Sequence, residues 1–444
     1  MNKEFHKKQN FFSFSDIDSE RKDRIMKFTS TEATPAPHVP PGVLRLTGAA
    51  KEDIPMYRIQ TMNKISPVGL NRFPSELYEV GDEVQDPQGI LVRSAKLLDL
   101  EFNPGLLAIA RAGVGVNNIP LDRCAAAGIP VFSTPGANAN AVKELVICAM
   151  LMGSRDIPGA IRWVREQAAS GADVSTVVEK GKSAFIGPEL YKKTLGIIGL
   201  GAIGSIVANT AISLGMDVYG YDPFLSVDTA LRLDRHVHVV KDINDLYKRS
   251  NYITMHIHYT EKTAHMIDAS AIAAMKRGVR VINLARGEIV DDEAMLTALD
   301  TGMVAAYITD FPNNRLLTAP HVIAMPHLGA STPESEQNCA AMAVDTLRDY
   351  LESGNIRSSV NLPEMTMDRS GVQRLCVLHK NVPGMLANIT SLFGRDGVNV
   401  ENLSNKSRGD YAYTMVDLGS KVGDNVIEDV RRTANVIRVR SLEW

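Results

Sequence analysis

The sequence predicts an α/β protein with two parallel-sheet units and a smaller C-terminal domain. Short β-rich runs alternate with longer helical stretches from about residue 56, which is typical of parallel sheets covered by helices. A glycine-rich turn joins one such strand to a helix at 199–204, and residues 372–444 follow a βαββαβ order. The chain of 444 residues, 45% of them hydrophobic, is long enough for more than one core.

Residues 1–55 differ from the rest of the chain and predict a flexible N-terminal extension. They mix both charge signs and contain a proline-rich run at 35–41. Acidic residues such as Glu4 and Asp16 disfavour an organelle transit peptide. Because no apolar stretch is long enough to span a bilayer and no signal peptide pattern opens the chain, we expect a cytoplasmic protein without membrane contact.

The first parallel-sheet unit is expected at 56–150 and the second at 151–333. In the first unit, strands are predicted at 90–93 and 107–111, and apolar residues at helical spacing predict a helix over 140–152. In the second unit, the candidates for buried strands are 194–198, 217–221, 252–256, 279–283 and 322–325. A helix over 334–353 then leaves this unit.

The C-terminal domain at 372–444 follows a polar connector at 361–370. Its strands are predicted at 374–378, 398–403, 411–417 and 436–440. One helix is predicted at 385–394 and a second before the last strand. This βαββαβ order predicts an antiparallel sheet of the ferredoxin-like type with its helices on one face.

Composition and spacing exclude several classes of ligand. The net charge is −3, so the chain has no positive surplus for a nucleic acid. The four cysteines lie far apart and predict reduced structural thiols. The histidine pairs at 236–238 and 256–258 have no acidic or cysteine partners at ligand spacing, so no metal site is predicted. Small molecules are therefore the expected ligands.

The motif Gly199-Leu-Gly201-Ala-Ile-Gly204 lies between an apolar strand and an apolar helix and predicts a dinucleotide site. Gly199 permits the tight turn, Gly201 lets a pyrophosphate approach the backbone, and Gly204 lets helix and strand pack closely. Asp222 ends the next predicted strand, where a carboxylate accepts hydrogen bonds from the adenosine ribose and repels the extra phosphate of NADP. The expected cofactor is NAD.

Two charged residues follow later strands of the same unit and form the candidate catalytic pair. Arg286 comes just past the strand at 279–283, and its planar guanidinium suits a carboxylate. His327 follows the strand at 322–325 and is suited to exchanging a proton with a hydroxyl. Ligands of open α/β sheets bind outside the carboxyl ends of the strands. Taken alone, Arg286 also fits a partner in a surface ion pair, and His327 also fits a loop histidine without a catalytic role.

Together with the glycine motif, these two segments resemble the D-isomer-specific 2-hydroxyacid dehydrogenases over about residues 56–360. The segment Arg111-Ala-Gly-Val-Gly-Val-Asn-Asn118 looks like the substrate-domain loop of that family, and Leu91-Val-Arg-Ser94 resembles its substrate-anion motif. The resemblance implies a Rossmann-like NAD-binding domain, 151–333, inserted in a flavodoxin-like substrate domain split between 56–150 and 334–360. The active site would lie between the two domains.

By this resemblance, Arg286 would hold the substrate carboxylate, His327 would exchange the proton, and hydride would pass between C2 and the nicotinamide. The residues expected to position the acid and its phosphate are Arg93, Ser94, Gly113, Val114 and Asn117. Further family cofactor positions are occupied by Ala202, Ile203, Ile257, Leu284, Ala285 and Asp310.

The chain departs from the family pattern next to Asp310. The family usually has a glutamate shortly afterwards that orients the histidine, whereas this chain reads Thr309-Asp-Phe-Pro-Asn-Asn-Arg315. Another acid, Asp310 or Glu288, serves His327, or His327 works without a carboxylate partner. The sequence leaves these alternatives open.

The segment His379-Lys-Asn381-Val-Pro-Gly384 resembles the opening of an ACT domain, a regulatory fold that often binds amino acids between paired subunits. His379, Asn381 and Asn399 match positions that bind serine in related proteins. A dehydrogenase joined to an ACT domain implies NAD-dependent oxidation of 3-phosphoglycerate, the first step of serine biosynthesis, in a homodimer or homotetramer regulated by serine.

Three other functions compete with this interpretation. The substrate could be another 2-hydroxy or 2-oxo acid, such as glyoxylate, 2-oxoglutarate or erythronate phosphate. The missing glutamate also fits a non-catalytic protein that senses NAD, and an amino-acid sensor with an inert dehydrogenase body is a third possibility. Activity with a phosphate-free acid would favour another substrate, and tight amino-acid binding without turnover would favour the sensor with an inert body.

Overall fold

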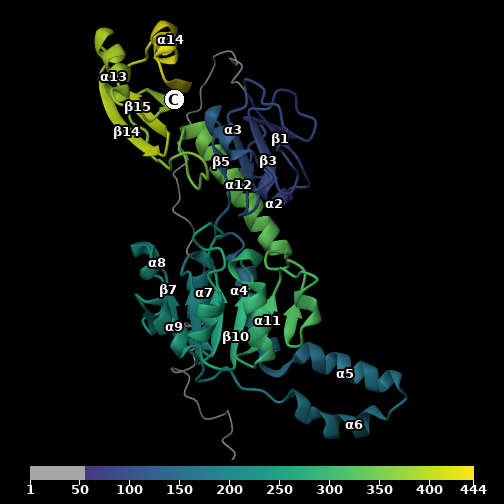
Figure 1. Cartoon of the computed structure of the whole chain (residues 1–444). Helices are drawn as coiled ribbons and strands as arrows, with labels where there is room; N and C mark the ends of the chain where they lie inside the picture. Colours follow the sequence, from purple (N-terminus) through teal and green to yellow (C-terminus); the bar gives the residue numbers. More distant parts are fainter. Residues whose placement is uncertain (1–55) are drawn as a thin grey trace, which may run out of the picture. The chain divides into compact units, whose positions relative to one another are not determined.

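The computed structural model describes residues 56–444, which contain three β-sheets with their covering helices (Figure 1). The predicted extension at 1–55 lies outside the described residues. Two of the sheets are parallel and the C-terminal sheet is antiparallel, so the predicted α/β class is confirmed. No helix within 56–444 has the length and apolar character needed to cross a bilayer.

The first sheet has five parallel strands in the order β2-β1-β3-β4-β5, which is a flavodoxin-like order. Its strands are β1 (Tyr57–Thr61), β2 (Tyr78–Gly81), β3 (Gly89–Val92), β4 (Ala108–Arg111) and β5 (Val131–Phe132). The short helices α2 (Pro67–Leu70) and α3 (Leu121–Ala126) connect them. The strands predicted at 90–93 and 107–111 are confirmed as β3 and β4, and the other three were not predicted.

The second sheet has seven parallel strands in the order β12-β11-β10-β9-β6-β7-β8. They are β6 (Thr194–Ile198), β7 (Asp217–Tyr221), β8 (Val237–Val239), β9 (Tyr252–Met255), β10 (Val279–Asn283), β11 (Val304–Thr309) and β12 (Val322–Ala324). The five predicted strands are present, whereas β8 and β11 were not predicted. From β6 the sheet continues through β7 and β8 on one side and through β9 to β12 on the other. The strand order therefore switches between β6 and β9, and ligands of such sheets bind at this switch point.

Helices cover both faces of the seven-stranded sheet, since α4 and α7 contribute to one hydrophobic core and α11 contributes to another. The main helices are α4 (Ala139–Arg155), α5 (Ile157–Ala169), α6 (Val174–Gly181), α7 (Ala202–Ser213), α9 (Ile243–Arg249) and α11 (Asp292–Asp300). Shorter turns are η1 (Lys182–Phe185), α8 (Val227–Ala230), α10 (Ala269–Ala273), η2 (Gly287–Ile289) and η3 (Leu316–Thr318).

Helix α4 was expected to belong to the first unit, which was predicted to end near residue 150, but it packs against the second unit. Its buried residues Val142, Val146 and Met150 pack in one core with Ile197 and Ile308 of the seven-stranded sheet. The apolar spacing predicted the helix correctly but could not show which sheet it covers. By packing, the second unit begins with α4 rather than after it.

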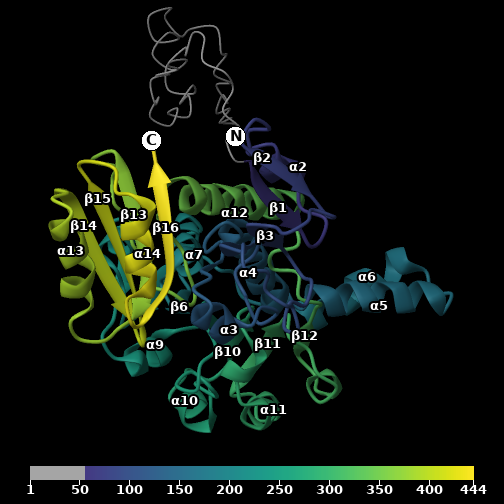
Figure 2. The same cartoon turned by 90° about the horizontal axis from the view of Figure 1, so that it is seen from above.

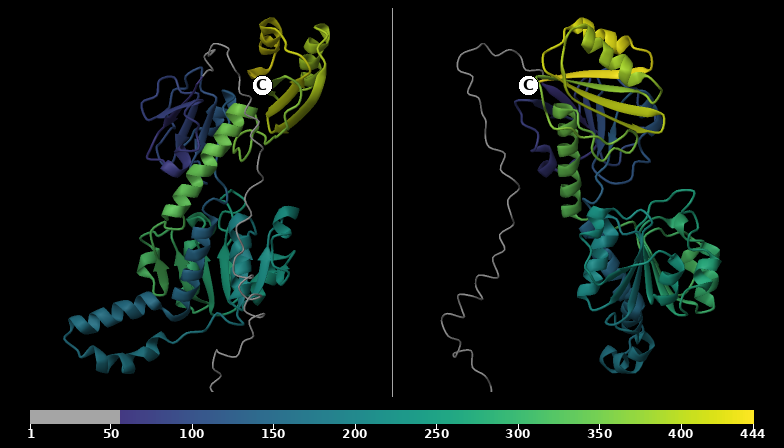
Figure 3. Two further views of the ribbon diagram at one scale, coloured as in Figure 1. Left: turned by 180° about the vertical axis from the view of Figure 1, so that it is seen from behind. Right: turned by 90° about the vertical axis from the view of Figure 1, so that its left-hand side faces the viewer.

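Helix α12 (Pro333–Ser353) returns to the five-stranded sheet (Figure 3). Thr332 caps its start by accepting a hydrogen bond from Ser335 N at 3.1 Å, and Gly354, with φ of +75°, ends it. Its buried face, including Val344 and Leu347, shares a core with Ile59 and Leu91. The first unit is thus built from two segments of the chain, one before the second unit and one after it.

The C-terminal sheet is antiparallel with the order β14-β15-β13-β16 (Figure 2). Its elements are β13 (Gln373–Lys380), α13 (Met385–Arg395), β14 (Val400–Arg408), β15 (Tyr411–Leu418), α14 (Asp424–Arg432) and β16 (Val436–Glu443). The predicted βαββαβ order is confirmed. The strand expected at 398–403 begins later and runs to Arg408, because it pairs with the whole of β15.

The C-terminal sheet packs on both of its faces. Helices α13 and α14 cover one face, and Phe393 and Val430 lie in the core between these helices and the sheet. The other face contributes Leu378, Met415 and Leu442 to the same core as the five-stranded sheet and α12. The domain expected as a separate C-terminal unit therefore shares its hydrophobic core with the first unit.

Arginines of this sheet also hold the C-terminal end of α12. Arg374 forms a fully buried ion pair with Asp417 at 2.6 Å and donates to Ser353 O at 2.8 Å. Arg440 donates to Tyr350 O and Leu351 O at 3.0 and 2.8 Å. The last carbonyl groups of a helix lack partners within it, and cations stabilise that end of the helix dipole.

Candidate active site

The glycine motif forms the turn between β6 and α7, and each glycine is needed for a different reason. Gly199 has φ of +90°, and a Cβ there would lie 2.6 Å from His256 O. A Cβ on Gly204 would lie 1.9 Å from Gly199 O, so helix and strand approach too closely for a side chain. At Gly201 a Cβ would meet no protein atom within 4 Å. The space beside Gly201 is therefore open, as an approaching pyrophosphate requires.

Asp222 follows β7 and faces this turn. Its Oδ2 accepts from Leu200 N and its Oδ1 from Phe224 N, both at 2.9 Å. Each carboxylate oxygen can accept more than one hydrogen bond, so the ribose hydroxyls can still bind there. Asp222 thus both shapes the glycine turn and presents a negative charge beside it.

The other predicted cofactor residues lie around the same strand ends. Ala202 and Ile203 form the first turn of α7, and Ile257 Cγ2 would lie 2.7 Å from a Cβ on Gly199. Leu284 and Ala285 are buried directly after β10. The Asp310 carboxylate is buried, and neither of its oxygens has a hydrogen-bond partner within residues 56–444. An amide of a bound nicotinamide would satisfy that acceptor, so these residues fit NAD.

Arg286 is held by the loop that follows β10. The fully buried Asn283 donates from Nδ2 to Arg286 O at 2.8 Å and accepts from Ala285 N at 3.2 Å. Arg286 Nη1 donates to Ala285 O at 2.6 Å. The remaining donors of the guanidinium point toward the loop after β4, because a Cβ on Gly115 would lie 3.3 Å from Arg286 Nη2.

His327 and Arg286 contact the same aromatic ring. The ring of Phe311 lies 4.7 Å from the His327 ring at 50°, and the Arg286 guanidinium carbon lies 5.7 Å from the Phe311 centroid. The structure thus brings both members of the predicted catalytic pair next to Phe311. Phe311 was not predicted as a site residue, although it directly follows Asp310.

The question of a carboxylate for His327 concerns Asp310 and Glu288. Burial raises the pKa of the Asp310 carboxyl group, and the charge of His327 acts in the opposite direction, so the two groups interact. Glu288 is exposed, and its side chain forms no hydrogen bond or ion pair with the residues described. Of the two candidates, Asp310 is the one that interacts electrostatically with His327.

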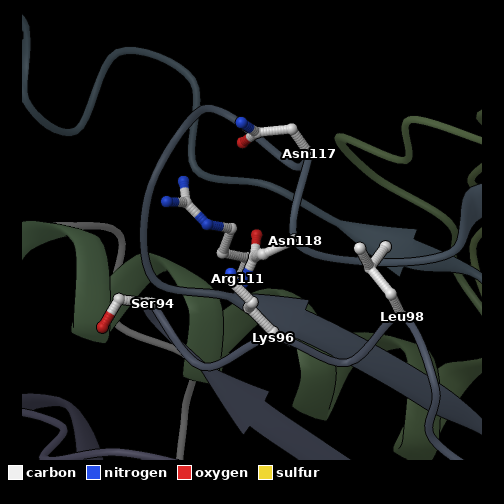
Figure 4. A pocket seen from close by; sticks show the side chains of 6 residues that line it. All are labelled: Ser94, Lys96, Leu98, Arg111, Asn117 and Asn118. Atoms are coloured by element: carbon white, nitrogen blue, oxygen red, sulfur yellow. The ribbon is translucent and has the colours of Figure 1, made fainter.

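A pocket of about 270 Å³ opens at the carboxyl ends of β3 and β4 (Figure 4). Its lining residues are Ser94, Lys96, Leu98, Arg111, Asn117 and Asn118. Two of these are cations and none is an acid. Ser94 and Asn117 were predicted as substrate residues, whereas Lys96, Arg111 and Asn118 were not given roles. Cations with polar amides suit a phosphate or a carboxylate.

Arg111 connects this pocket to Arg286. A Cβ on Gly115 would lie 3.9 Å from Arg111 Nη1, 3.8 Å from Asn117 Oδ1 and 3.3 Å from Arg286 Nη2. Burial lowers the pKa of Arg111, and the neighbouring charges of Arg286 and Arg93 act in the same direction. A bound anion would relieve this repulsion. Arg111 is the last residue of β4, so the strand-end rule that singled out Arg286 could also have found it.

The remaining predicted substrate residues lie at the edge of the pocket. Arg93 follows β3, and its guanidinium pairs with Glu336 of α12 at 2.6 Å. Gly113 allows the Arg111 side chain to pass, because a Cβ there would lie 2.6 Å from Arg111 Nη1. Val114 is half-buried in the same loop. Arg93 is thus engaged by a protein carboxylate rather than turned into the pocket.

A second pocket, of about 230 Å³, lies between β13 and the start of α13. Its lining residues are His379, Asn381, Val382, Gly384, Met385, Leu386, Ala387 and Asn405. His379 is buried and contacts Thr414 Oγ1 through Nε2 at 2.8 Å. Two of the three predicted regulatory residues thus line one pocket, together with Asn405, which was not predicted.

Asn399 does not join that pocket. Its carbonyl accepts from Gly419 N at 3.0 Å, at one end of β15, whereas His379 pairs with Ala412 near the other end. Its side chain donates to Glu401 at 2.9 Å. Within a single chain, the structure therefore separates Asn399 from His379 and Asn381.

Comparison with known proteins supports the fold and the presence of an NAD-binding domain. Residues 147–329 match the family model of the D-isomer specific 2-hydroxyacid dehydrogenase, NAD binding domain. The NAD+-bound 3-phosphoglycerate dehydrogenase of Entamoeba histolytica is a similar solved structure, with a TM-score of 0.54 and 26% identity. That similarity covers 69% of this chain and 99% of the Entamoeba chain.

Among curated relatives, the D-3-phosphoglycerate dehydrogenase of Synechocystis sp. is 36% identical over 326 residues, which is 71% of this chain. The present chain spans only 56% of that relative's length. The D-3-phosphoglycerate dehydrogenase of Haemophilus influenzae is 31% identical over 379 residues, or 82% of this chain and 88% of the relative. This chain therefore belongs to the D-isomer-specific 2-hydroxyacid dehydrogenase family and carries its NAD-binding domain.

Proposed function

We propose that this protein oxidises 3-phosphoglycerate to 3-phosphohydroxypyruvate with NAD, the first step of L-serine biosynthesis. The observation that carries the proposal is the convergence of Arg111, Asn117 and Arg286 around Gly115. This convergence supports the binding of a substrate with two anionic groups, because Arg286 lies beside a pocket that contains two further cations. Relatives named D-3-phosphoglycerate dehydrogenase support the same substrate.

In this mechanism Arg286 binds the substrate carboxylate and orients C2. When bound, NAD supplies the hydride acceptor. His327 accepts the proton of the C2 hydroxyl group as hydride leaves C2, and it returns the proton in the reverse reaction. Arg111, Lys96 and the amides of the pocket bind the phosphate at the other end of the substrate. The buried Asp310 would accept a hydrogen bond from the carboxamide of the cofactor and fix its orientation.

The C-terminal pocket is proposed to bind serine as a regulator. His379, Asn381 and Asn405 supply polar side chains, and backbone N–H groups at the start of α13 suit a carboxylate. Gly384 has φ of +84°, and a Cβ there would meet no atom within 4 Å, so this end of the helix is open. Asn399 can take part only across an interface with a second copy, which is the arrangement expected of an ACT dimer.

A homodimer is also supported by the helical pair α5 and α6. Neither helix has a buried side chain, and Ile161 and Val164 are 51% and 37% exposed. Both helices are amphipathic, so a second copy is the expected cover for their apolar face. Trp163 and Phe185 pack together with ring centroids 5.9 Å apart and hold the pair in place.

Helix α12 provides a route from the regulatory domain to the substrate pocket. Its C-terminal end is held by Arg374 and Arg440 of the C-terminal sheet, and Glu336 in its first turn pairs with Arg93. Glu336 competes with a substrate anion for Arg93. We propose that serine binding acts by shifting α12 and strengthening this competition.

The test follows NADH absorbance after purified protein is mixed with NADH and 3-phosphohydroxypyruvate, with and without serine. Turnover that serine suppresses is the expected result, and Asn381→Ala should retain turnover while losing the effect of serine. Glyoxylate, 2-oxoglutarate and erythronate phosphate serve as competing acids, and faster turnover of one of them would reassign the substrate. Binding of NADH without reduction of any acid would contradict the proposal and favour the NAD-sensing protein.

A further inference from the structure

The His327 side chain has no hydrogen-bond or ion-pair partner within residues 56–444. Its backbone carbonyl accepts a hydrogen bond from Ser331 Oγ, but neither nitrogen of the ring takes part in a hydrogen bond there. The residue is exposed. Within the described chain, therefore, no hydrogen bond fixes the orientation of the ring. A catalytic histidine must nevertheless be held in register with its substrate. The close ring of Phe311 is the group that can do this.

Phe311 is itself held rigidly at the end of β11. Its backbone N–H donates to Oγ1 of the fully buried Thr309 at 3.1 Å, and Pro312 restricts the chain on the other side. Its Cβ would lie 3.4 Å from a Cβ on Gly287, so the start of the side chain lies close to the loop that carries Arg286. An aromatic side chain with a fixed backbone and few rotamers is a suitable platform for a neighbouring ring.

The Phe311 ring lies close to the cation of Arg286 and to His327, which carries a positive charge when it is protonated. The Arg286 guanidinium carbon lies 5.7 Å from the centre of the Phe311 ring, and the His327 ring lies 4.7 Å from it. The face of an aromatic ring attracts cations, so it can stabilise the imidazolium that forms when His327 takes up a proton. Because both groups contact the same ring, both can reach one 2-hydroxy acid.

We propose that Phe311 positions His327 for catalysis by ring contact, in place of a hydrogen-bonded carboxylate, and sets its spacing from Arg286. Phe311 is a positioning residue, since it acts through His327. The inference rests on the proposed function for its kinetic consequence. Its geometric content, a defined His327–Phe311 ring contact in the folded protein, can be measured without turnover.

The kinetic test compares Phe311→Leu, which removes the ring, with Phe311→Tyr, which keeps it. Phe311→Leu should lower kcat by about tenfold, the effect of losing an aromatic contact that is used in the transition state. Its KM should rise less than its kcat falls, because Arg286 keeps its hydrogen bond to Ala285 O, and its affinity for NADH should not change, because the cofactor is expected at the glycine turn. Phe311→Tyr should retain most of the activity. A wild-type kcat in Phe311→Leu would overturn the proposal.

A matched control exists in the same domain. Tyr219 on β7 also lies between a histidine and an arginine, 4.8 Å from the His238 ring and 5.5 Å from the Arg249 guanidinium carbon. Tyr219→Leu removes an equivalent contact without touching the proposed catalytic pair. It should leave kcat unchanged. An equal loss of kcat in this control would show that both variants act through general destabilisation, and would refute a positioning role.

A spectroscopic test separates this inference from the proposed function. In protein labelled at histidine Cε1, the His327 signal is assigned by its loss in His327→Gln. The ring current of Phe311 should displace this signal, and Phe311→Leu should move it, whereas Tyr219→Leu should not. If the protein turns over no acid but the signal moves, the contact stands and the proposed function fails. An unmoved signal would refute the contact, whatever the activity.

Discussion

The glycine turn gives a sharp prediction, because two of its glycines leave very different space for a methyl group. In Gly201→Ala the new Cβ would enter open space, with no protein atom within 4 Å, and φ of −64° suits alanine. The free energy of unfolding should therefore change by less than about 0.5 kcal/mol. In Gly204→Ala the Cβ would lie 1.9 Å from Gly199 O, a backbone atom that cannot move without displacing β6.

The two variants should therefore separate binding from folding. A methyl group in the space for the pyrophosphate should cost about 1–3 kcal/mol of NAD affinity, which raises the Kd by about 5- to 150-fold in Gly201→Ala. Gly204→Ala should lose about 3 kcal/mol of unfolding free energy through the backbone clash. Urea unfolding measures stability, and quenching of protein fluorescence by NADH measures affinity.

Either of two results would refute this reasoning. If Gly201→Ala bound NADH as tightly as the unmodified protein, the open space beside Gly201 would not be the cofactor site. If Gly204→Ala were as stable as the unmodified protein, the close approach of α7 to β6 would not constrain this position.

Three further predictions concern carboxylates. Asp222→Ala should narrow the preference for NAD over NADP in kcat/KM, because it removes the charge that repels a 2′-phosphate, and an unchanged ratio would exclude Asp222 as the determinant. Burial raises the pKa of Asp310, so the folded protein loses stability as pH rises through that pKa. Asp310→Asn should accordingly raise the Tm of the cofactor-free protein at pH 7, with a gain that shrinks as the pH falls toward about 4. Asp417→Ala should cost about 3–5 kcal/mol in urea unfolding, because Arg374 is left buried without its partner. Lys421→Ala, which breaks an exposed pair with Glu443, should cost less than about 1 kcal/mol, and similar losses in both variants would contradict the role of burial.

Local patterns in the sequence were sufficient for the dinucleotide turn and the candidate catalytic pair. Gly199, Gly201 and Gly204 act within one turn of the chain, so their spacing alone predicts the geometry that the structure contains. Arg286 and His327 each follow a buried strand, and parallel strands end on one edge of a sheet. The prediction that both lie at that edge needed no knowledge of strand order.

Features that depend on packing between distant segments could not be predicted in this way. The helical spacing of α4 shows an apolar face but not which sheet it covers, and that choice moved the expected boundary at 150. The C-terminal sheet has apolar residues on both faces, yet only the structure shows that one face joins the core of α12. Asn399 and His379 lie in one short domain, but strand register places them at opposite ends.

The sequence by itself determined the fold class, the order of most elements, the cofactor loop and the two residues proposed for catalysis, because each depends on a local period or on a residue directly after a strand. The tertiary structure decided which other side chains contact these residues. In the sequence Phe311 is an apolar residue without a motif, and only the tertiary structure shows that its ring contacts both Arg286 and His327. Such contacts arise from the order of strands in the sheet, which no single segment of the chain encodes.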